Sequence, residues 1–134
     1  MHITGQCHCG FVTYEAEIDP SNVSICHCSD CQRLTGSAYR VTVSTTIDSF
    51  HVTRGRPKLY VKIGDTGSKR LQFFCGDCGS PLYVTGEGAD AENVGIRLGT
   101  IDQRRTLNPT RQSWCRSALP WAMNIADLPA KDTE

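Results

Sequence analysis

The sequence contains no long hydrophobic run. No segment approaches the roughly 20 consecutive apolar residues that a membrane-spanning helix needs. The first residues, M-H-I-T-G-Q-C, also lack the apolar stretch of a signal peptide. We therefore expect no membrane partner and no export, and we predict a cytoplasmic protein that keeps its thiols reduced.

A net charge of either sign is also absent, because 14 Lys and Arg residues balance 14 Asp and Glu residues. No basic run is interleaved with aromatic residues, so we expect no nucleic-acid partner. The basic residues nevertheless concentrate in residues 54–70 and 97–116. If these segments share one face they favour a small anionic ligand, since guanidinium groups bind carboxylates bidentately. The alternative is a solvated basic surface.

Linkers rich in Gly, Pro and Ser are missing, as are low-complexity segments. The length of 134 residues suits one domain with its own core, so we expect a single domain over residues 1–134. Only residues 130–134 are expected to form a frayed tail. The sequence carries no indication of an oligomeric state.

Helical signals are scarce, and one short segment has them. Ser29 to Leu34 is expected to form a helical turn, with Ser29 as its cap and Gly36 as its stop. Elsewhere, short runs of β-branched and aromatic residues alternate with turn residues, which is typical of strands. The sequence therefore predicts an all-β fold of small sheets. The expected strands cover residues 11–18, 23–26, 38–45, 50–54, 58–63, 69–74, 82–85, 94–98 and 111–116.

Cysteine, in contrast, is abundant, and seven of the eight cysteines fall into three clusters. In a chain without an export signal, clustered thiols indicate metal ligands rather than disulfides. A disulfide framework is the formal alternative, because the count is even. The clusters are Cys7 and Cys9, then Cys26, Cys28 and Cys31, and finally Cys75 and Cys78.

The two cysteine pairs predict a closed structural zinc site. In the C-x-C pair Cys7 and Cys9, an extended backbone places both thiols on one face. The C-x-x-C-G segment that contains Cys75 and Cys78 curls around a metal, and its glycines permit positive φ angles. A four-thiolate zinc formed by both pairs would close a long loop of the chain.

The triplet Cys26, Cys28 and Cys31 predicts a second site with three thiolates and one free vertex. The first two cysteines end a strand, and the third lies on the following helical turn. Catalytic zinc sites keep such an open position. Three alternatives remain open. A fourth ligand closes the site, Cys28 and Cys31 join Cys75 and Cys78 in a zinc ribbon, or the three thiols form a redox group. The candidates for a fourth ligand are His8, His27 and Cys115.

An open three-thiolate zinc favours a thiol as its fourth ligand, because zinc binds sulfur and lowers the pKa of the thiol. The expected chemistry is the making or breaking of a carbon–sulfur bond. His27 either relays a proton or, as strand alternation favours, points away from the metal. Cys115 is expected in the core, and Trp114 and Trp121 in the core or in a pocket wall.

The order of the motifs resembles the glutathione-dependent formaldehyde-activating enzyme family, which also includes centromere protein V-type domains. The resemblance covers nearly the whole chain. One position departs from it, since Gln112 stands where members often have histidine. The motifs are C-x-C-G (7–10), C-H-C-x-x-C-x-R-x-T-G-S-A (26–38), F-C-x-x-C-G-S-P-L (74–82), G-T-I-D (99–102), W-x-x-S-x-x-P-W (114–121) and D-L-P (127–129).

The resemblance implies a β-tent of small antiparallel sheets stabilised by two zinc ions. It implies a structural zinc on the cysteine pairs and a catalytic zinc on Cys26, Cys28 and Cys31. The implied activity is that of a carbon–sulfur lyase, which adds the thiol of glutathione to formaldehyde or reverses that reaction. Candidate residues for the pocket wall follow the triplet directly, at Arg33, Thr35 and Ser37. The alternative from another class is a non-catalytic zinc-stabilised binding module.

Overall fold

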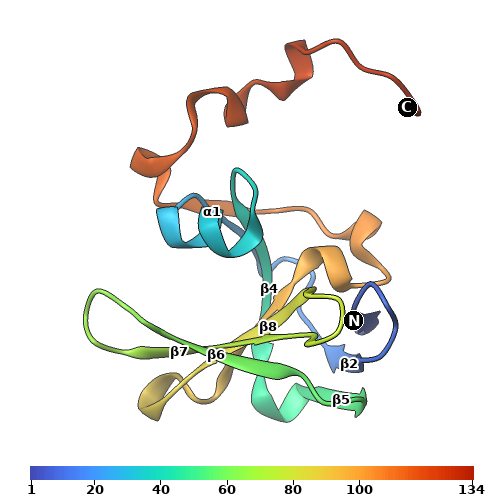
Figure 1. Ribbon diagram of the computed structural model, residues 1–134, viewed down its shortest axis with the longest axis vertical. Helices are drawn as coiled ribbons and strands as arrows, with labels where there is room; N and C mark the ends of the chain where they lie inside the picture. The colour runs from blue at the N-terminus through green and yellow to red at the C-terminus, as the bar shows by residue number, and fades with distance from the viewer.

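The computed structural model describes residues 1–134 and arranges ten strands in two sheets (Figure 1). The smaller sheet has the order β1 (His2–Gln6), β2 (Thr13–Glu17), β5 (Phe50–Arg54). The larger has the order β10 (Arg111–Ser113), β3 (Val23–Cys26), β4 (Arg40–Thr46), β9 (Asn93–Arg97), β8 (Pro81–Gly86), β7 (Lys69–Phe74), β6 (Lys58–Ile63).

Helical structure is limited to short elements. The α-helix α1 covers Ser29–Thr35. The remaining elements are single 3₁₀ turns between or after strands. They are η1 (Ile47–Ser49), η2 (Gly88–Asp90), η3 (Leu98–Thr100), η4 (Arg104–Thr106), η5 (Cys115–Ser117), η6 (Pro120–Met123) and η7 (Ile125–Asp127). None of the helices is both long and apolar enough to cross a membrane.

The predicted all-β architecture is confirmed, several strand ends differ by one or two residues, and three larger differences concern β1 and β10. Strand β1 was not predicted, because Ile3 is its only large apolar residue. Strand β10 stops at Ser113 rather than at Arg116, because Trp114 adopts a left-handed conformation with φ of 56°. β10 also pairs with β3 in parallel, whereas the other strand pairs are antiparallel.

The core lies between the two sheets. Directly opposed residues of antiparallel strands share a face, and one such row on the larger sheet contains the buried residues Val23, Val43, Ile96 and Tyr83. The smaller sheet contributes Ile3, Tyr14, Ala16 and Phe50. The Phe50 ring bridges the sheets, with ring centroids 5.3 Å from Tyr14 and 4.5 Å from Tyr83.

Gly5 marks a close approach within this core. An added Cβ would overlap the Tyr14 ring and lie 2.6 Å from the Thr100 carbonyl oxygen. We expect Gly5→Ala to lower the free energy of unfolding by about 2–3 kcal/mol, as overpacking does. The control is Gly99→Ala, where an added Cβ meets nothing within 4 Å. Chemical denaturation of both variants measures the difference, and equal stabilities would contradict this packing argument.

The opposite face of the larger sheet lies under α1 (Figure 1). Register places Arg40 beside Cys26, and Arg97 beside Thr42, on that face. An ion pair between Lys62 Nζ of β6 and a carboxylate oxygen of Asp30, 2.9 Å long, joins α1 to the sheet. This face, with α1 above it, forms the floor of the candidate site.

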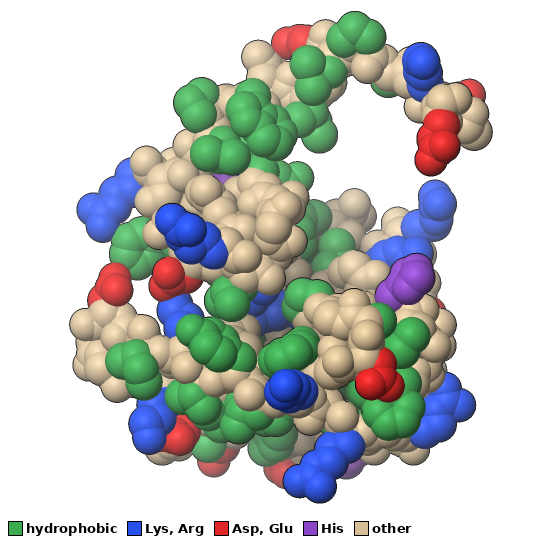
Figure 2. Space-filling model, viewed as in Figure 1, with side chains coloured by type: hydrophobic (Ala, Val, Ile, Leu, Met, Phe, Trp, Pro, Cys, Tyr) green, Lys and Arg blue, Asp and Glu red, His purple; other side chains and the backbone are tan.

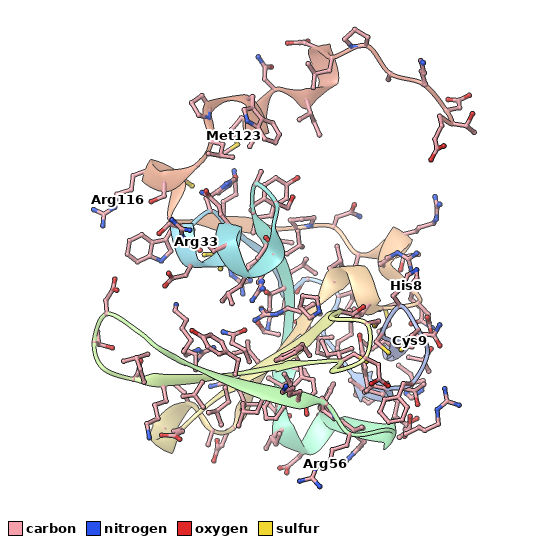
Figure 3. The ribbon with its side chains drawn as sticks, in the orientation of Figure 1. His8, Cys9, Arg33, Arg56, Arg116 and Met123 are labelled. Carbon is pink, nitrogen blue, oxygen red and sulfur yellow. The ribbon has the colours of Figure 1, made fainter.

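The chain after β10 leaves the sheets and runs past α1 (Figure 1). Arg116 and Met123 lie on this segment (Figure 3). The predicted frayed end, residues 130–134, is exposed and has no regular structure.

Candidate metal centres

The sulfurs of Cys7, Cys9, Cys75 and Cys78 all lie within 4.8 Å of one another, and we call them the four-thiol cluster. The Sγ atom of Cys9 lies 3.6 Å from that of Cys7 and 3.8 Å from that of Cys75. Zinc–sulfur bonds of 2.3 Å at tetrahedral angles would separate the sulfurs by about 3.8 Å. The two predicted cysteine pairs thus meet in space, and their sulfurs are spaced as in a four-thiolate metal site.

Two turns of similar form shape the four-thiol cluster. Gly10 has a φ of 79° and donates its N–H to the Cys7 carbonyl. Gly79 also has a φ of 79° and donates to the Cys75 carbonyl. Only glycine adopts such angles without strain. The glycine that follows each cysteine pair therefore lets the chain curl back, so that both thiols of the pair point inward.

Cys26, Cys28 and Cys31 form a second group, the three-thiol cluster, whose sulfurs also lie within 4.8 Å of one another. Cys26 is the last residue of β3, and Cys28 caps α1, where its Sγ accepts the Cys31 N–H at 3.2 Å. The predicted cap, Ser29, is instead the first helical residue. Gly36 ends the helix in the left-handed conformation, as predicted.

The thiols of the three-thiol cluster shift one another's pKa values, upward for Cys31 and downward for Cys26. Burial, together with the neighbouring Cys28 and Cys26, raises the pKa of Cys31 to about 12. Burial also disfavours the Cys26 thiolate, but hydrogen bonds from the Cys28 N–H and the Ser113 hydroxyl outweigh it and lower the Cys26 pKa. Three thiolates this close need a cation to coexist, and the soft donor set suits zinc.

In the four-thiol cluster, hydrogen bonds favour the thiolate form of Cys78. Hydrogen bonds from the Ser80 hydroxyl and from the Cys9 and Ser80 backbone N–H groups lower the pKa of Cys78 to about 5. All eight cysteines are free, so the disulfide alternative has no support in this structure. Both clusters are thus groups of reduced thiols that could hold metal ions, consistent with zinc.

His27 lies between two ligands of the three-thiol cluster but is not part of it. Its ring is buried, and its Nε2 atom lies 2.8 Å from Oε1 of Gln112 on β10. Because an amide oxygen can only accept, His27 donates through Nε2. The prediction that His27 points away from the metal site agrees with this geometry. Gln112, the position that departs from the family pattern, is therefore the partner of His27.

The other proposed fourth ligands also lie outside the three-thiol cluster. His8 is exposed in the loop between Cys7 and Cys9 (Figure 3). Cys115 is exposed on η5, so the expectation of a core position was wrong, because the chain has already left the sheets there. The separation into groups of four and three also leaves no zinc ribbon between the triplet and the second cysteine pair.

Cys28 opens onto a polar pocket of about 410 Å³. Lys62, Arg70 and Trp114 line it, so Trp114 forms a pocket wall as predicted. Trp114 is the only non-glycine residue with a positive φ, and its ring lies 5.0 Å from the Arg116 guanidinium. Backbone strain of this kind concentrates at functional sites. Trp121, in contrast, is exposed on η6.

Two further pockets lie on the face of the larger sheet that α1 covers, which we call the site face. Tyr60, Gln72 and Arg40 line one of about 370 Å³. Thr35, Arg97 and again Arg40 line another of about 340 Å³. Figure 2 shows basic side chains within the hollow between α1 and the sheet.

The sequence-based candidates for the pocket wall are only partly borne out. Thr35 lines a pocket, whereas Arg33 and Ser37 are exposed. Of the two basic segments, Lys62, Arg70 and Arg97 reach the site face. Sequence reasoning missed Arg40 and Gln72. A basic residue within an otherwise apolar and β-branched strand was the available signal for Arg40.

The comparisons with known proteins agree with this architecture. The model of the family described as glutathione-dependent formaldehyde-activating enzyme matches residues 2–117. A crystal structure of a Rhodobacter sphaeroides protein is similar to the chain, with a TM-score of 0.64 and 23% identity. The match covers 82% of this chain and 99% of that one, and it concerns the fold alone. No curated protein matches the chain significantly.

Proposed function

The chain belongs to the glutathione-dependent formaldehyde-activating enzyme family, and on that premise we propose that it is a zinc-dependent carbon–sulfur lyase. Its substrates would be a small thiol, such as glutathione, and formaldehyde. In the forward direction a sulfur–carbon bond forms, the carbonyl π bond breaks, and the thiol proton ends on the former carbonyl oxygen. The product with glutathione is S-hydroxymethylglutathione.

The observation that carries this proposal is the difference between the two clusters. Four thiols meet in one, whereas three meet in the other, and no histidine or fourth cysteine completes the second. Structural zinc sites are closed, while catalytic ones keep three protein ligands and one open position. We therefore assign the four-thiol cluster to a structural zinc and the three-thiol cluster to a catalytic zinc.

Zinc held by Cys26, Cys28 and Cys31 would supply a Lewis acid that favours sulfur and lowers the pKa of a substrate thiol. The protein's own residues set where that thiol enters. Cys28 borders the 410 Å³ pocket, so the open side of the cluster would face the Trp114 wall.

The local hydrogen bonds hold the three thiols in place. The side-chain amide nitrogen of Gln32 on α1 donates to the carbonyl oxygens of His27, at 2.9 Å, and Ser117, at 3.0 Å. The His27 N–H donates to the Ser113 carbonyl at 3.1 Å. These bonds connect β3, α1 and the chain after β10, so the three thiols and Trp114 would keep a fixed relative position.

The test is exchange spectroscopy by NMR on mixtures of glutathione, formaldehyde and S-hydroxymethylglutathione. Zinc-loaded protein is expected to raise the exchange rate above that of the spontaneous reaction, in proportion to protein concentration. The zinc content of the same sample should be two ions per chain. A sample with both ions that leaves the exchange rate unchanged would contradict the proposed reaction.

A further inference from the structure

Two arginines are buried on the site face of the larger sheet. Arg40 is 5% exposed and Arg97 is 9% exposed. Arg40 Nη1 and Arg97 Nη2 donate to the same atom, Oε1 of Gln72, at 3.2 and 2.7 Å. Arg97 Nη1 also donates to Thr42 Oγ1 at 3.0 Å. A single neutral oxygen thus holds two guanidinium groups together.

Neither arginine has a carboxylate partner. The ion pairs of the structure involve Met1, His2 and Lys62, but not Arg40 or Arg97. The Nε atom of Arg40 is buried and has no hydrogen-bond partner at all. Buried charges are costly unless they are paired, so this arrangement calls for an anion. Burial and the neighbouring Arg40 lower the pKa of Arg97 to about 9, in keeping with that need.

The three-thiol cluster provides only part of the negative charge that Arg40 and Arg97 require. Four basic residues line the three pockets of this face, against two carboxylates, those of Asp30 and Asp65. A divalent ion on three thiolates adds one net negative charge. At least one positive charge therefore remains without a partner, and Arg40 stands in the wall of two pockets where a ligand would meet it.

We propose that Arg40, Gln72 and Arg97 form a carboxylate subsite, and that the thiol substrate therefore also carries a carboxylate. The substrate class is that of thiol acids rather than neutral thiols. A carboxylate would accept the free N–H of Arg40 and remaining guanidinium N–H groups, since arginine offers five donors in a planar fork. The identity of the thiol rests on the proposed function, whereas the subsite rests on the arginine geometry.

The proposal depends on the side chain at position 72 being neutral rather than negatively charged. Glutamate there would pair with both guanidinium groups from within the protein, whereas glutamine bridges them without neutralising them. Gln72→Glu is nearly isosteric, so it tests charge with little change in packing. If an anionic ligand is the missing partner, Gln72→Glu removes the need for it.

The experiment is calorimetric titration of zinc-loaded protein with 3-mercaptopropionate and with 3-mercapto-1-propanol, its neutral alcohol counterpart. Wild type is expected to bind the acid about tenfold or more tightly than the alcohol, the effect of hydrogen bonds to a charged group. In Gln72→Glu this preference should vanish, and the midpoint of thermal unfolding should rise. Arg97→Gln is a second variant that should also reduce the preference.

Asn108→Asp is the matched control, because it makes the same change of charge at an exposed loop position. It should keep the preference of wild type. A second titration with propionate and 1-propanol, which lack sulfur, tests the subsite independently of zinc. Wild type should prefer propionate, and Gln72→Glu should not.

The outcomes separate this inference from the proposed function, because no titration contains formaldehyde. If wild type prefers the acids and Gln72→Glu does not, the subsite stands even when the exchange assay fails. If wild type binds acid and alcohol equally, or Gln72→Glu keeps the preference, the subsite is wrong even when the exchange assay succeeds. Loss of zinc from Arg97→Gln with an unchanged preference for propionate would overturn it too, because the arginines would then serve the metal alone.

Discussion

Cys75→Ser is expected to leave the protein unfolded at room temperature. Cys75 is fully buried and belongs to both the core and the four-thiol cluster. Structural zinc sites contribute on the order of 10 kcal/mol or more of apparent folding free energy, and whole domains are stable by about 5–15 kcal/mol. Loss of one of four ligands therefore removes much or all of the stability. Circular dichroism and the zinc content per chain measure the result.

Cys115→Ser is the matched control for this prediction. It makes the same chemical change at an exposed cysteine outside both clusters, so the fold and both ions should remain. Addition of a strong chelator to wild type should reproduce the unfolding of Cys75→Ser. A Cys75→Ser protein that unfolds cooperatively with wild-type stability would show that the four-thiol cluster does not stabilise the fold.

The fold could be predicted where local sequence carries the signal. Strand β3 was predicted with its observed bounds, as were β5, β6 and β7, because each contains β-branched or aromatic residues between turn residues. Strand β1 depends on its pairing with β2, and its own residues, H-I-T-G-Q, carry no strand pattern. The end of β10 depends on the left-handed conformation of Trp114, which no residue-type rule assigns to tryptophan.

The candidate site, like the fold, could be predicted only where local sequence carries the signal. Cysteine spacing predicted which thiols could meet, since C-x-C and C-x-x-C bring ligands together within one turn of chain. The contacts between Arg40, Arg97 and Gln72 join three different strands and depend on sheet register. The hydrogen bond between His27 and Gln112, which lie 85 residues apart, also depends on sheet register. Such contacts have no local pattern, and only the folded chain reveals them.

Cys28→Ser is expected to remove one zinc ion and the exchange activity while the fold is retained. The three-thiol cluster lies outside the core between the sheets, and its cysteines are only half-buried. Cys28 also caps α1 through its side chain, and serine is among the best N-cap residues, so the helix should persist. Loss of a metal ion that stabilises the transition state by several kcal/mol corresponds to about a thousandfold fall in rate.

The contrast between Cys28→Ser and Cys75→Ser distinguishes an enzyme from a zinc-stabilised binding module. An enzyme with a separate catalytic ion predicts that zinc falls from two ions to one in Cys28→Ser, with an unchanged circular dichroism spectrum and an exchange rate close to the spontaneous one. A binding module predicts no catalysed exchange in wild type. If wild type holds a single zinc that disappears together with the fold in Cys28→Ser, the three-thiol cluster is structural. The assignment of separate structural and catalytic roles to the two clusters would then be wrong, because the three-thiol cluster would hold the ion on which the fold depends.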